Sequence, residues 1–553
     1  MCGILGGINT RFDHACVERL SHRGPDQLSL DKVLVGPDLE VTLGQTRLNI
    51  VDRHDIELPI KVERPGAKPA TIVFNGEIYN WLELKKELEG LGWSFHTKTD
   101  TEVALAAYLQ WGPSCLERFN GMFALAIWDG DRFFCARDRL GKKPFFYRCI
   151  GKRFEFASEV KAFDELSFVG NDLFDLLEFC PDEHTLCKDV FSLSPGQYLV
   201  YDPSRGTMLT RDYWDIPHRF GERITDEGDA IDRFVELLTD SVKLRMRADV
   251  PVTMFLSGGI DSTLVAVLAG IKEAFTCQFD EFKDTIDEEL YARDFADRLG
   301  IELHVVRPTK EQFLADLPRL AYHLEIPTGS FSVFPLYRLA AACHAAKYKV
   351  ILSGEGSDEL FAGYARNEFL VWPAFDLSDP KVKSYLPMLR RFEGSDLDRF
   401  CRMASRSGLA GAALMRGYLA HLWSDHRSML DNMCYVETRV FLQPLLQMAD
   451  RMTMAHSVEG RNPFLDYRLV EFAFTLDDSL RNKGGVGKWL VKAAAQRLLP
   501  KDTLLLSRKV KHGLPTPINI WLQGQASFDR KYWTSLMTAE CIKNLQRGSP
   551  LKS

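Results

Sequence analysis

The stretch Pro251–Thr263, PVTMFLSGGIDST, decides the fold and the first chemistry of this 553-residue chain. A strand-like apolar run leads into a turn of small residues, and the sequence then continues as a helix, STLVAVLAG. Gly258 and Gly259 let the backbone approach an anion closely, and the start of the helix presents unpaired N–H groups to it. An isolated SGG would be a plain tight turn, but the strand–turn–helix context favours a phosphate site. Asp261 would repel a naked phosphate, so we expect Mg²⁺ between them. Further hydrogen bonds could come from Ser257, Ser262 and Thr263.

The alternation of strand and helix continues after this turn. Strand-like runs AFTCQFD (274–280) and IELHVVRP (301–308) flank the helical pattern ELYARDFADRLG (289–300). This order predicts a doubly wound, mostly parallel sheet. A second turn of small residues, in KYKVILSGEGSDELFAGY (347–364), brings three acids to the carboxyl edge of that sheet: Glu355, Asp358 and Glu359. The pattern is almost wholly helical from about residue 395.

The region before residue 206 follows a different pattern. Short β-rich runs such as ATIVFNGEIYN (70–80) and GQYLVYDP (196–203) alternate with helical segments such as TEVALAAYLQWG (101–112). This mixture predicts two antiparallel sheets with a few helices. A polar stretch with little apolar periodicity follows and predicts a linker. We therefore expect one domain at 2–205, a linker at 206–227, a second domain at 228–525 and a C-terminal tail at 526–553.

The composition indicates an ordinary folded chain. It is 46% hydrophobic and 26% charged with a net charge of −7, which disfavours nucleic acid or a membrane surface as partner. Twelve cysteines show no CxxC pairs or metal-ligand spacing, so we interpret them as reduced thiols of a cytoplasmic protein. The sequence opens with no secretion-signal pattern, and no apolar run approaches ~18 residues, so we expect no membrane span.

The N-terminal MCGILGG suggests a second kind of chemistry. If Met1 is removed, Cys2 carries the only α-amino group of the chain. An α-amine with a pKa of roughly 8 can serve as base for the thiol beside it. A cysteine at this position is usually a small hydrophobic residue, so its assignment depends on the rest of the chain.

Motifs along nearly the whole chain carry a resemblance to a known family. In the first domain they are MCGI (1–4), SHRGPD (21–26), TRLNIVD (46–52), FNGEIYN (74–80), TDTEVALAAY (99–108), FNGMFALAIWD (119–129), ARDRLGKKPFFY (136–147) and FASEVKA (156–162). In the second they are LSGGIDS (256–262), LSGEGSDELFAGY (352–364), DRMTMAHSVEGRNPFLD (450–466) and GKWLVK (487–492). The first set resembles class II glutamine amidotransferase domains, and the second resembles the synthetase domain of glutamine-hydrolysing asparagine synthetases. The resemblance implies an Ntn-hydrolase-type αββα sandwich followed by a doubly wound α/β domain with a helical C-terminal part.

For the first domain, the resemblance implies a glutaminase. Cys2 would attack the side-chain amide of glutamine and form a γ-glutamyl thioester, while Asn75 and Gly76 would stabilise the oxyanion. A basic residue would pair with the α-carboxylate of glutamine, and two acids would receive its ammonium group. The implied glutamine-binding residues are Arg47, Ile50, Val51, Asn75, Gly76, Glu77 and Asp100.

For the second domain, the resemblance implies that ATP activates a carboxylic acid as an acyl-adenylate. The implied ATP-binding residues are Leu256, Ser257, Gly258, Gly259, Asp261, Ser262, Cys277, Ser353 and Gly354, with Mg²⁺ bound through Asp261. Glu355 corresponds to an acid tied to adenylate formation, and Lys488 to a lysine that neutralises charge on the phosphates. The implied acceptor-binding residues are Glu355, Asp358 and Arg451. Ammonia would pass internally between the two sites and so avoid protonation in water. A homodimer is the habit of the family.

Three departures from the asparagine synthetase pattern leave the acceptor open. The segment LEIPTGSFSVFPLY (324–337) lacks the usual aspartate-containing stretch, Leu514 stands where an aromatic is common, and residues 365–430 match no acceptor pattern. Our first hypothesis is conversion of L-aspartate to L-asparagine, and the alternative is a sugar uronate or a natural-product acid.

Three other functions are disfavoured by the motifs. Cys2 argues against lactam-forming relatives, which need no ammonia. The intact SGGIDS motif, Glu355 and Lys488 argue against a regulatory protein with an inactive synthetase half. A sugar-phosphate amidotransferase would lack the ATP loop.

Overall fold

The structure is a computed structural model that describes residues 2–36, 38–54, 56–64, 66–169, 174, 180, 183–217, 223–282, 288–326, 328–364, 366–367, 394–405, 408–500, 516–522 and 530–547. Leu514 and residues 368–393, which bear on the acceptor, lie outside this part. Within it, no helix is long and apolar enough to cross a membrane. All twelve cysteines are free thiols.

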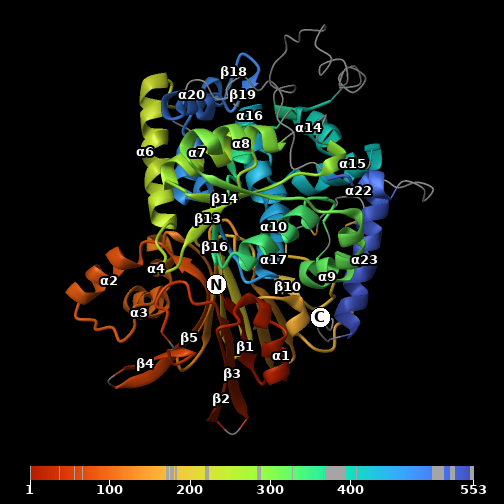
Figure 1. Cartoon of the computed structure of the whole chain (residues 1–553). Helices are drawn as coiled ribbons and strands as arrows, with labels where there is room; N and C mark the ends of the chain where they lie inside the picture. Colours follow the sequence, from red (N-terminus) through yellow and green to blue (C-terminus); the bar gives the residue numbers. More distant parts are fainter. Residues whose placement is uncertain are drawn as a thin grey trace.

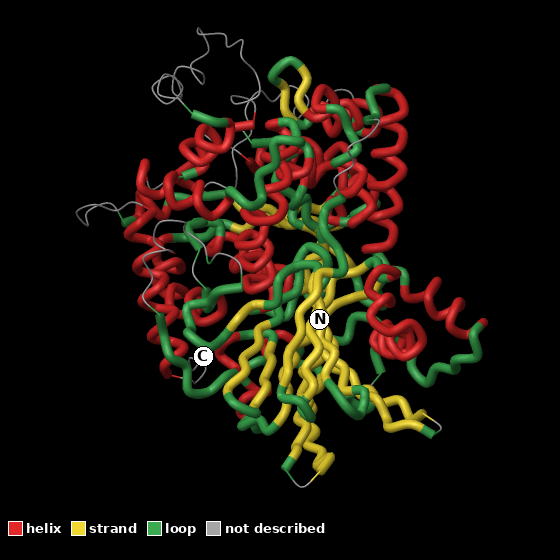
Figure 2. Tube along the Cα trace, turned by 180° about the vertical axis from the view of Figure 1, so that it is seen from behind, coloured by secondary structure: helices red, strands yellow, loops and turns green. Residues whose placement is uncertain are grey.

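Two antiparallel sheets form the N-terminal half (Figures 1 and 2), and each has six strands within the described residues. The first sheet runs in the order β10 (Phe191–Ser192), β8 (Phe146–Ile150), β9 (Arg153–Ala157), β1 (Cys2–Ile8), β3 (Leu39–Arg47), β2 (Gln27–Gly36). The second runs in the order β12 (Thr207–Asp212), β11 (Gln197–Asp202), β7 (Phe133–Arg137), β6 (Gly121–Trp128), β5 (Ala67–Ile78), β4 (Ile60–Arg64).

Strand alternation assigns side chains to three layers of core. Ile4 of β1 packs against residues of the second sheet such as Val73, while Leu5 points to the other face and packs against α1 (His14–Glu18). Three helices cover the outer face of the second sheet: α2 (Trp81–Gly90), α3 (Asp100–Trp111) and α4 (Cys115–Arg118). The half is therefore the αββα sandwich that the sequence predicts.

A parallel sheet forms the centre of the second half. Its strands follow the order β13 (Val252–Met254), β16 (Val350–Leu352), β17 (Glu459–Arg461). A parallel bridge from Phe255 to Phe275 continues it into the parallel pair β14 (Glu273–Cys277) and β15 (Glu302–Val306). Crossovers between all these strands contain helices, as parallel pairing requires.

Helices cover both faces of this sheet. One face carries α6 (Glu227–Arg245), α7 (Ile260–Ala269), α8 (Glu288–Leu299) and α20 (Trp489–Leu498). The other carries α9 (Lys310–Leu324), α10 (Val333–Ala345) and the end of α17 (Leu442–Met454). The remaining described elements are α11 (Ser357–Leu360), α14 (Asp396–Ala404), α15 (Gly408–Leu419), α16 (Met429–Val436), α18 (Tyr467–Ala473), α19 (Asp478–Arg481), β18 (Asn482–Lys483), β19 (Val486–Gly487), α22 (Ile518–Trp521) and α23 (Arg530–Arg547).

The two halves meet along the start of β1. Figure 1 marks the N-terminus, where β1 begins, at the junction below β16, and β1 runs from there into the lower half. Helix α23, within the stretch predicted to be a C-terminal tail, lies along α9 and buries Trp533, Met537 and Cys541. The predicted fold class, an antiparallel sandwich followed by a doubly wound α/β domain with a helical C-terminal part, is confirmed.

Candidate active sites

The turn after β13 has the geometry of a phosphate loop. Gly258 has φ +62°, and a Cβ added there would lie 2.8 Å from Cβ of Tyr291. The backbone N–H of Ser257 donates to Oγ of Ser262 over 3.3 Å, and Thr263 Oγ1 donates to the carbonyl of Gly259 over 2.8 Å. These bonds hold the loop against the first turn of α7, and the start of a helix favours an anion.

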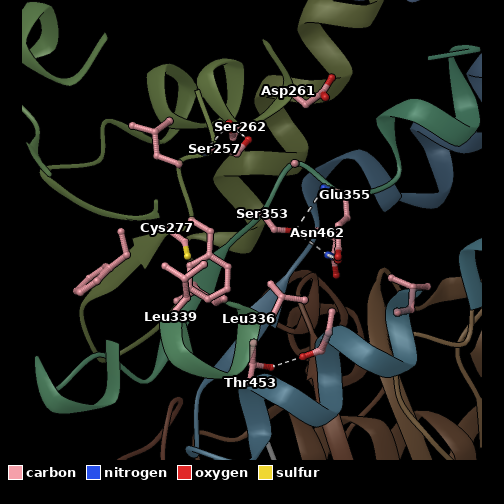
Figure 3. Close-up of a pocket in the computed structure, with 18 of the residues that line it drawn as sticks. Ser257, Asp261, Ser262, Cys277, Leu336, Leu339, Ser353, Glu355, Thr453 and Asn462 are labelled. Atoms are coloured by element: carbon pink, nitrogen blue, oxygen red, sulfur yellow. Dashed lines mark hydrogen bonds between the residues drawn. The ribbon is translucent and has the colours of Figure 1, made fainter. Parts of the chain in front are cut away.

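A cavity of about 260 Å³ opens from this loop (Figure 3). One end is apolar and is lined by Phe255, Phe275, Cys277, Leu336, Leu339 and Ile351. The other end is polar and is lined by Ser257, Asp261, Ser262, Ser353, Gly354, Glu355, Asp358 and Asn462. An apolar slot that continues into a phosphate loop suits a nucleotide, with its base at the first end. Seven of the nine predicted ATP-binding residues line this one cavity, and the other two, Gly258 and Gly259, lie in the loop beside it.

Lys488 lies where two acids of this cavity meet. Its Nζ is 2.7 Å from Oδ2 of Asp261 and 2.6 Å from Oδ1 of Asp358, and the lysine is buried. One ammonium therefore holds two carboxylates side by side at the phosphate loop. Hard oxygen donors in this arrangement fit Mg²⁺.

Glu355 is a partly buried acid at the polar end. Asn462 Nδ2 donates to its Oε2 over 2.8 Å and to Oγ of Ser353 over 2.9 Å, as the dashed lines in Figure 3 show. Burial and the nearby Glu359 raise the pKa of Glu355 to about 7, and the bond from Asn462 opposes this rise. Glu355 therefore changes charge near neutral pH.

A second site surrounds Cys2. This residue begins β1 and pairs in register with Arg47 of β3, and its backbone N donates to Oδ1 of Asn75 over 3.3 Å. Nδ2 of Asn75 is buried and has no hydrogen-bond partner among the described residues. Gly76 has φ +152°, and a Cβ there would lie 2.0 Å from the carbonyl oxygen of Met122. A free amide donor beside the thiol is what an oxyanion requires.

Arg47 is held by neutral oxygen atoms. Its guanidinium donates to Oε1 of Gln27 over 2.8 Å and to backbone carbonyls of Val51, Asp52 and His54 over 3.3, 2.5 and 2.9 Å. It forms no ion pair within 4 Å in the part of the chain that the structure describes. Its charge is thus available to a carboxylate. Ile50 is buried and packs beneath this loop with Val51.

Two buried acids, Glu77 and Asp100, belong to the second site. Burial and Asp100 raise the pKa of Glu77 well above its usual value. Burial raises the pKa of Asp100 to about 6, although the backbone N–H of Ile78 donates to Oδ2 over 2.8 Å. A cation that binds between two such carboxylates relieves their repulsion.

Arg451 lies away from the nucleotide cavity. It is buried in ion pairs with Glu159 and Glu325, over 2.5 and 3.0 Å, and its Nη2 donates to the carbonyl of Ser158. Although burial opposes it, Arg451 and Lys161 hold the pKa of Glu159 well below its usual range. The structure therefore places Arg451 in a junction between the halves and not among the residues that line the cavity.

Sequence reasoning missed several residues of the cavity wall. Lys142 and Lys143 reach it from the first half, where Lys143 Nζ lies 3.2 Å from Asp450 Oδ1 and Lys142 donates to the carbonyl of Leu465. Burial lowers the pKa of Lys142 to about 8. The only local signal is the pair of lysines in GKKP. Gly460 and Asn462 lie within the motif DRMTMAHSVEGRNPFLD (450–466), but the motif gave them no role, because their roles depend on contacts distant in sequence.

Together these features define an amidotransferase, in which a cysteine-bearing sandwich meets a nucleotide-binding domain. Residues 1–214 match the glutamine amidotransferase domain family, and residues 233–535 match the asparagine synthase family. Similar proteins include asparagine synthetase (glutamine-hydrolyzing) 1 of Bacillus subtilis, 32% identical, with 95% of this chain and 88% of that protein covered. A putative asparagine synthetase of Mycobacterium tuberculosis strain H37Rv is 32% identical, with coverages of 93% and 85%. Amidase chry2 of Gibberella zeae is 26% identical, with coverages of 96% and 88%.

The chain therefore belongs to the asparagine synthase family. It is an ATP-using, carbon–nitrogen ligase of the glutamine-hydrolysing asparagine synthetase type. The predicted resemblance and enzyme class are confirmed.

Proposed function

We propose that the protein converts L-aspartate to L-asparagine with nitrogen from glutamine. The observation that most supports transfer of nitrogen from glutamine is that Gly460 of β17 lines the nucleotide cavity, while Arg461 of the same strand lies 3.6 Å from Glu77 in the Cys2 site. A carboxylate oxygen of the acceptor attacks the α-phosphorus of ATP, and pyrophosphate leaves. Ammonia then attacks the acyl carbon, AMP leaves with the former carboxylate oxygen, and the nitrogen releases a proton.

In the first half-reaction, the Cys2 thiol attacks the amide carbon of glutamine, the thiol proton passes to the amide nitrogen, and ammonia leaves as the C–N bond breaks. Water then hydrolyses the thioester, which releases glutamate and restores the thiol. Asn75 Nδ2 donates to the oxyanion, and Gly76 allows the backbone to approach because any side chain there would meet Met122. Arg47 receives the α-carboxylate of glutamine. The α-ammonium group of glutamine lies between Glu77 and Asp100, because the repulsion between these two carboxylates favours a bound cation.

In the second half-reaction, the phosphate loop of Ser257–Ser262 holds the pyrophosphate that leaves. Asp261 and Asp358 would hold Mg²⁺, which neutralises phosphate charge when bound. Lys488 keeps these two carboxylates together and adds a further positive charge. Glu355 faces the acceptor as a carboxylate above its pKa.

The same chemistry on another acid is a second candidate. Amidase chry2 matches 96% of the chain, and its name as an amidase supports an acceptor other than aspartate. A sugar uronate or a natural-product acid would fit this alternative.

A screen of acids distinguishes the two candidates. The enzyme is supplied with ATP, Mg²⁺, glutamine and one acid at a time, and pyrophosphate release and product mass are measured. Aspartate should give the highest kcat/KM and a product of asparagine mass. A higher value for a uronate would replace aspartate with the alternative, and no release with any acid would contradict ligase activity.

The remaining assignments follow from the same reasoning. We propose domains at 2–205 and 228–525, joined by 206–227 and followed by 526–553. The free thiols support a reducing, cytoplasmic compartment. The habit of the family supports a homodimer, which size-exclusion chromatography with light scattering tests.

A further inference from the structure

The strand β17 is the wall between the two sites. It pairs in parallel with β16, with Val350 opposite Glu459 and Leu352 opposite Arg461. Alternation along the strand turns Glu459 and Arg461 to one side and Gly460 to the other. Gly460 borders the nucleotide cavity, while Arg461 reaches toward Glu77 in the glutamine site. The backbone of β17, three residues long, thus separates the glutamine site from the nucleotide cavity.

Arg461 is fixed on three sides and open on the fourth. Its Nε pairs with Oε1 of Glu459 over 2.6 Å, and its Nη1 donates to the carbonyls of Arg245 and Arg247, each over 2.7 Å. Its Nη2 has no hydrogen-bond partner among the described residues and lies 3.6 Å from Oε1 of Glu77. A buried, oriented cation beside Glu77 favours the ionised form of that acid.

Asn462 stands at the end of the same strand and serves the other site. Its amide spans Ser353 and Glu355, which follow β16, and the backbone N–H of Ser353 donates to the carbonyl of Arg461 over 3.0 Å. The bond to Glu355 fixes one carboxylate oxygen and leaves the other for chemistry. Arg461 and Asn462 are therefore neighbours in the sequence, but each contacts a residue of a different reaction site.

We propose that Arg461 and Asn462 are positioning residues for the two half-reactions, Arg461 acting through Glu77 on glutamine binding and Asn462 acting through Glu355 on adenylation. The inference rests on the proposed function. Arg461 is the last residue of β17 and Asn462 follows it directly. Because β17 is paired to β16, the distance and orientation between the two sites are fixed.

The substitution Asn462→Ala tests the adenylation half. Pyrophosphate release with ammonia as nitrogen donor should fall roughly tenfold to hundredfold, the usual effect of removing a hydrogen bond to a buried charged group. Glu355 must be ionised, so the rate falls as the pH drops through its pKa near 7. Without the bond that lowers this pKa, the acidic limb of the pH profile should move to higher pH, while the KM for glutamine stays unchanged.

Asn120→Ala is the matched control. Asn120 Nδ2 donates to Oδ2 of Asp466 over 2.9 Å, which is a similar buried bond that touches neither candidate carboxylate. Its loss should leave the acidic limb in place. An Asn462→Ala enzyme whose limb does not move relative to wild type would overturn the role of Asn462.

The substitution Arg461→Lys tests the glutaminase half. Lysine keeps the charge but cannot hold Glu459, two carbonyls and Glu77 together, so the KM for glutamine should rise roughly tenfold. Pyrophosphate release supported by ammonia should be retained. Arg245→Lys is the control, because Arg245 is equally buried and lies over the same Tyr79 ring, at 4.7 Å compared with 5.4 Å for Arg461.

Two outcomes separate this inference from the proposed function. If Arg461→Lys and Asn462→Ala lower both half-reactions equally, both residues are merely structural and the inference fails. If the wild-type enzyme releases no pyrophosphate with any acid, the proposed function fails, while glutamate release by the Arg461→Lys enzyme still tests the role of Arg461.

Discussion

Asn75 connects the start of the chain to the chemistry of the first site. One end of its amide accepts from the backbone N of Cys2, and the other end presents an unused donor beside the thiol. In the proposed mechanism the same side chain therefore orients the nucleophile and donates to the oxyanion.

Replacing the nucleophile should separate the two half-reactions. Cys2→Ala should lower glutamine-dependent product formation by at least ~10³-fold, as loss of a nucleophile does. Ammonia should still support product formation, because the nucleotide cavity contains no atom of Cys2. Product mass is measured with each nitrogen source. Loss of the ammonia reaction as well would contradict this division of labour.

At the scale of elements, α7 shows how strand, turn and helix build a phosphate site. Its first turn follows a glycine with positive φ, and its last residue is followed by Gly270 with φ +61°. The two glycines share the left-handed backbone but differ in surroundings. A Cβ at Gly258 would meet α8, whereas a Cβ at Gly270 would meet nothing within 4 Å.

The different surroundings of Gly258 and Gly270 allow the effect of a collision to be separated from the effect of backbone strain. Gly258→Ala should lower kcat/KM for ATP by roughly tenfold or more, because strain of roughly 1–2 kcal/mol is joined by a collision that displaces the loop. Gly270→Ala imposes a similar strain without the collision and should leave kcat/KM for ATP unchanged. Initial rates at varied ATP measure both. Equal losses in the two variants would show that backbone strain alone, and not the shape of the loop, is responsible.

Elements with local signals were predictable from sequence, and those with distant partners were not. The glycines and serines of the turn after β13 specify a turn locally, so the position of the turn and of its acid could be predicted from the sequence. Helix α23 was assigned to a tail, although Trp533, Met537 and Cys541 recur every four residues, which is the signal of one buried helix face. The three residues of β17 are too short for any periodicity, and their roles arise from pairing with β16 a hundred residues away.

At the scale of the whole molecule, buried charges join the two halves. Arg451 of the second half pairs with Glu159 of the first half and with Glu325, and Arg23 pairs with both Glu159 and Asp450. The resemblance gave Arg451 a role in acceptor binding, whereas the structure gives it three contacts at this junction. A sequence motif can therefore single out a residue such as Arg451 without indicating which residues its side chain contacts.

Arg451→Met should therefore destabilise the protein. Removing one partner from a buried ion pair typically costs about 3–5 kcal/mol, because the remaining carboxylates stay buried without compensation. Thermal unfolding followed by circular dichroism should show a melting temperature several degrees lower. Arg11→Ala is the control, since its pair with Glu165 is exposed and such pairs contribute ~0–1 kcal/mol. An unchanged melting temperature with a raised KM for the acceptor would instead support a binding role for Arg451.

The shortness of β17 also constrains how this chain can vary in length. Side chains in a strand change sides at every residue, so one inserted or deleted residue just before Glu459 would turn Glu459 and Arg461 toward the nucleotide and Gly460 toward glutamine. A substitution in this strand affects the chemistry on one side of it. A shift of the strand by one residue would exchange the side chains that face the nucleotide with those that face glutamine, and both reactions would be lost. We therefore expect the segment between α17 and β17 to tolerate substitutions far better than insertions or deletions.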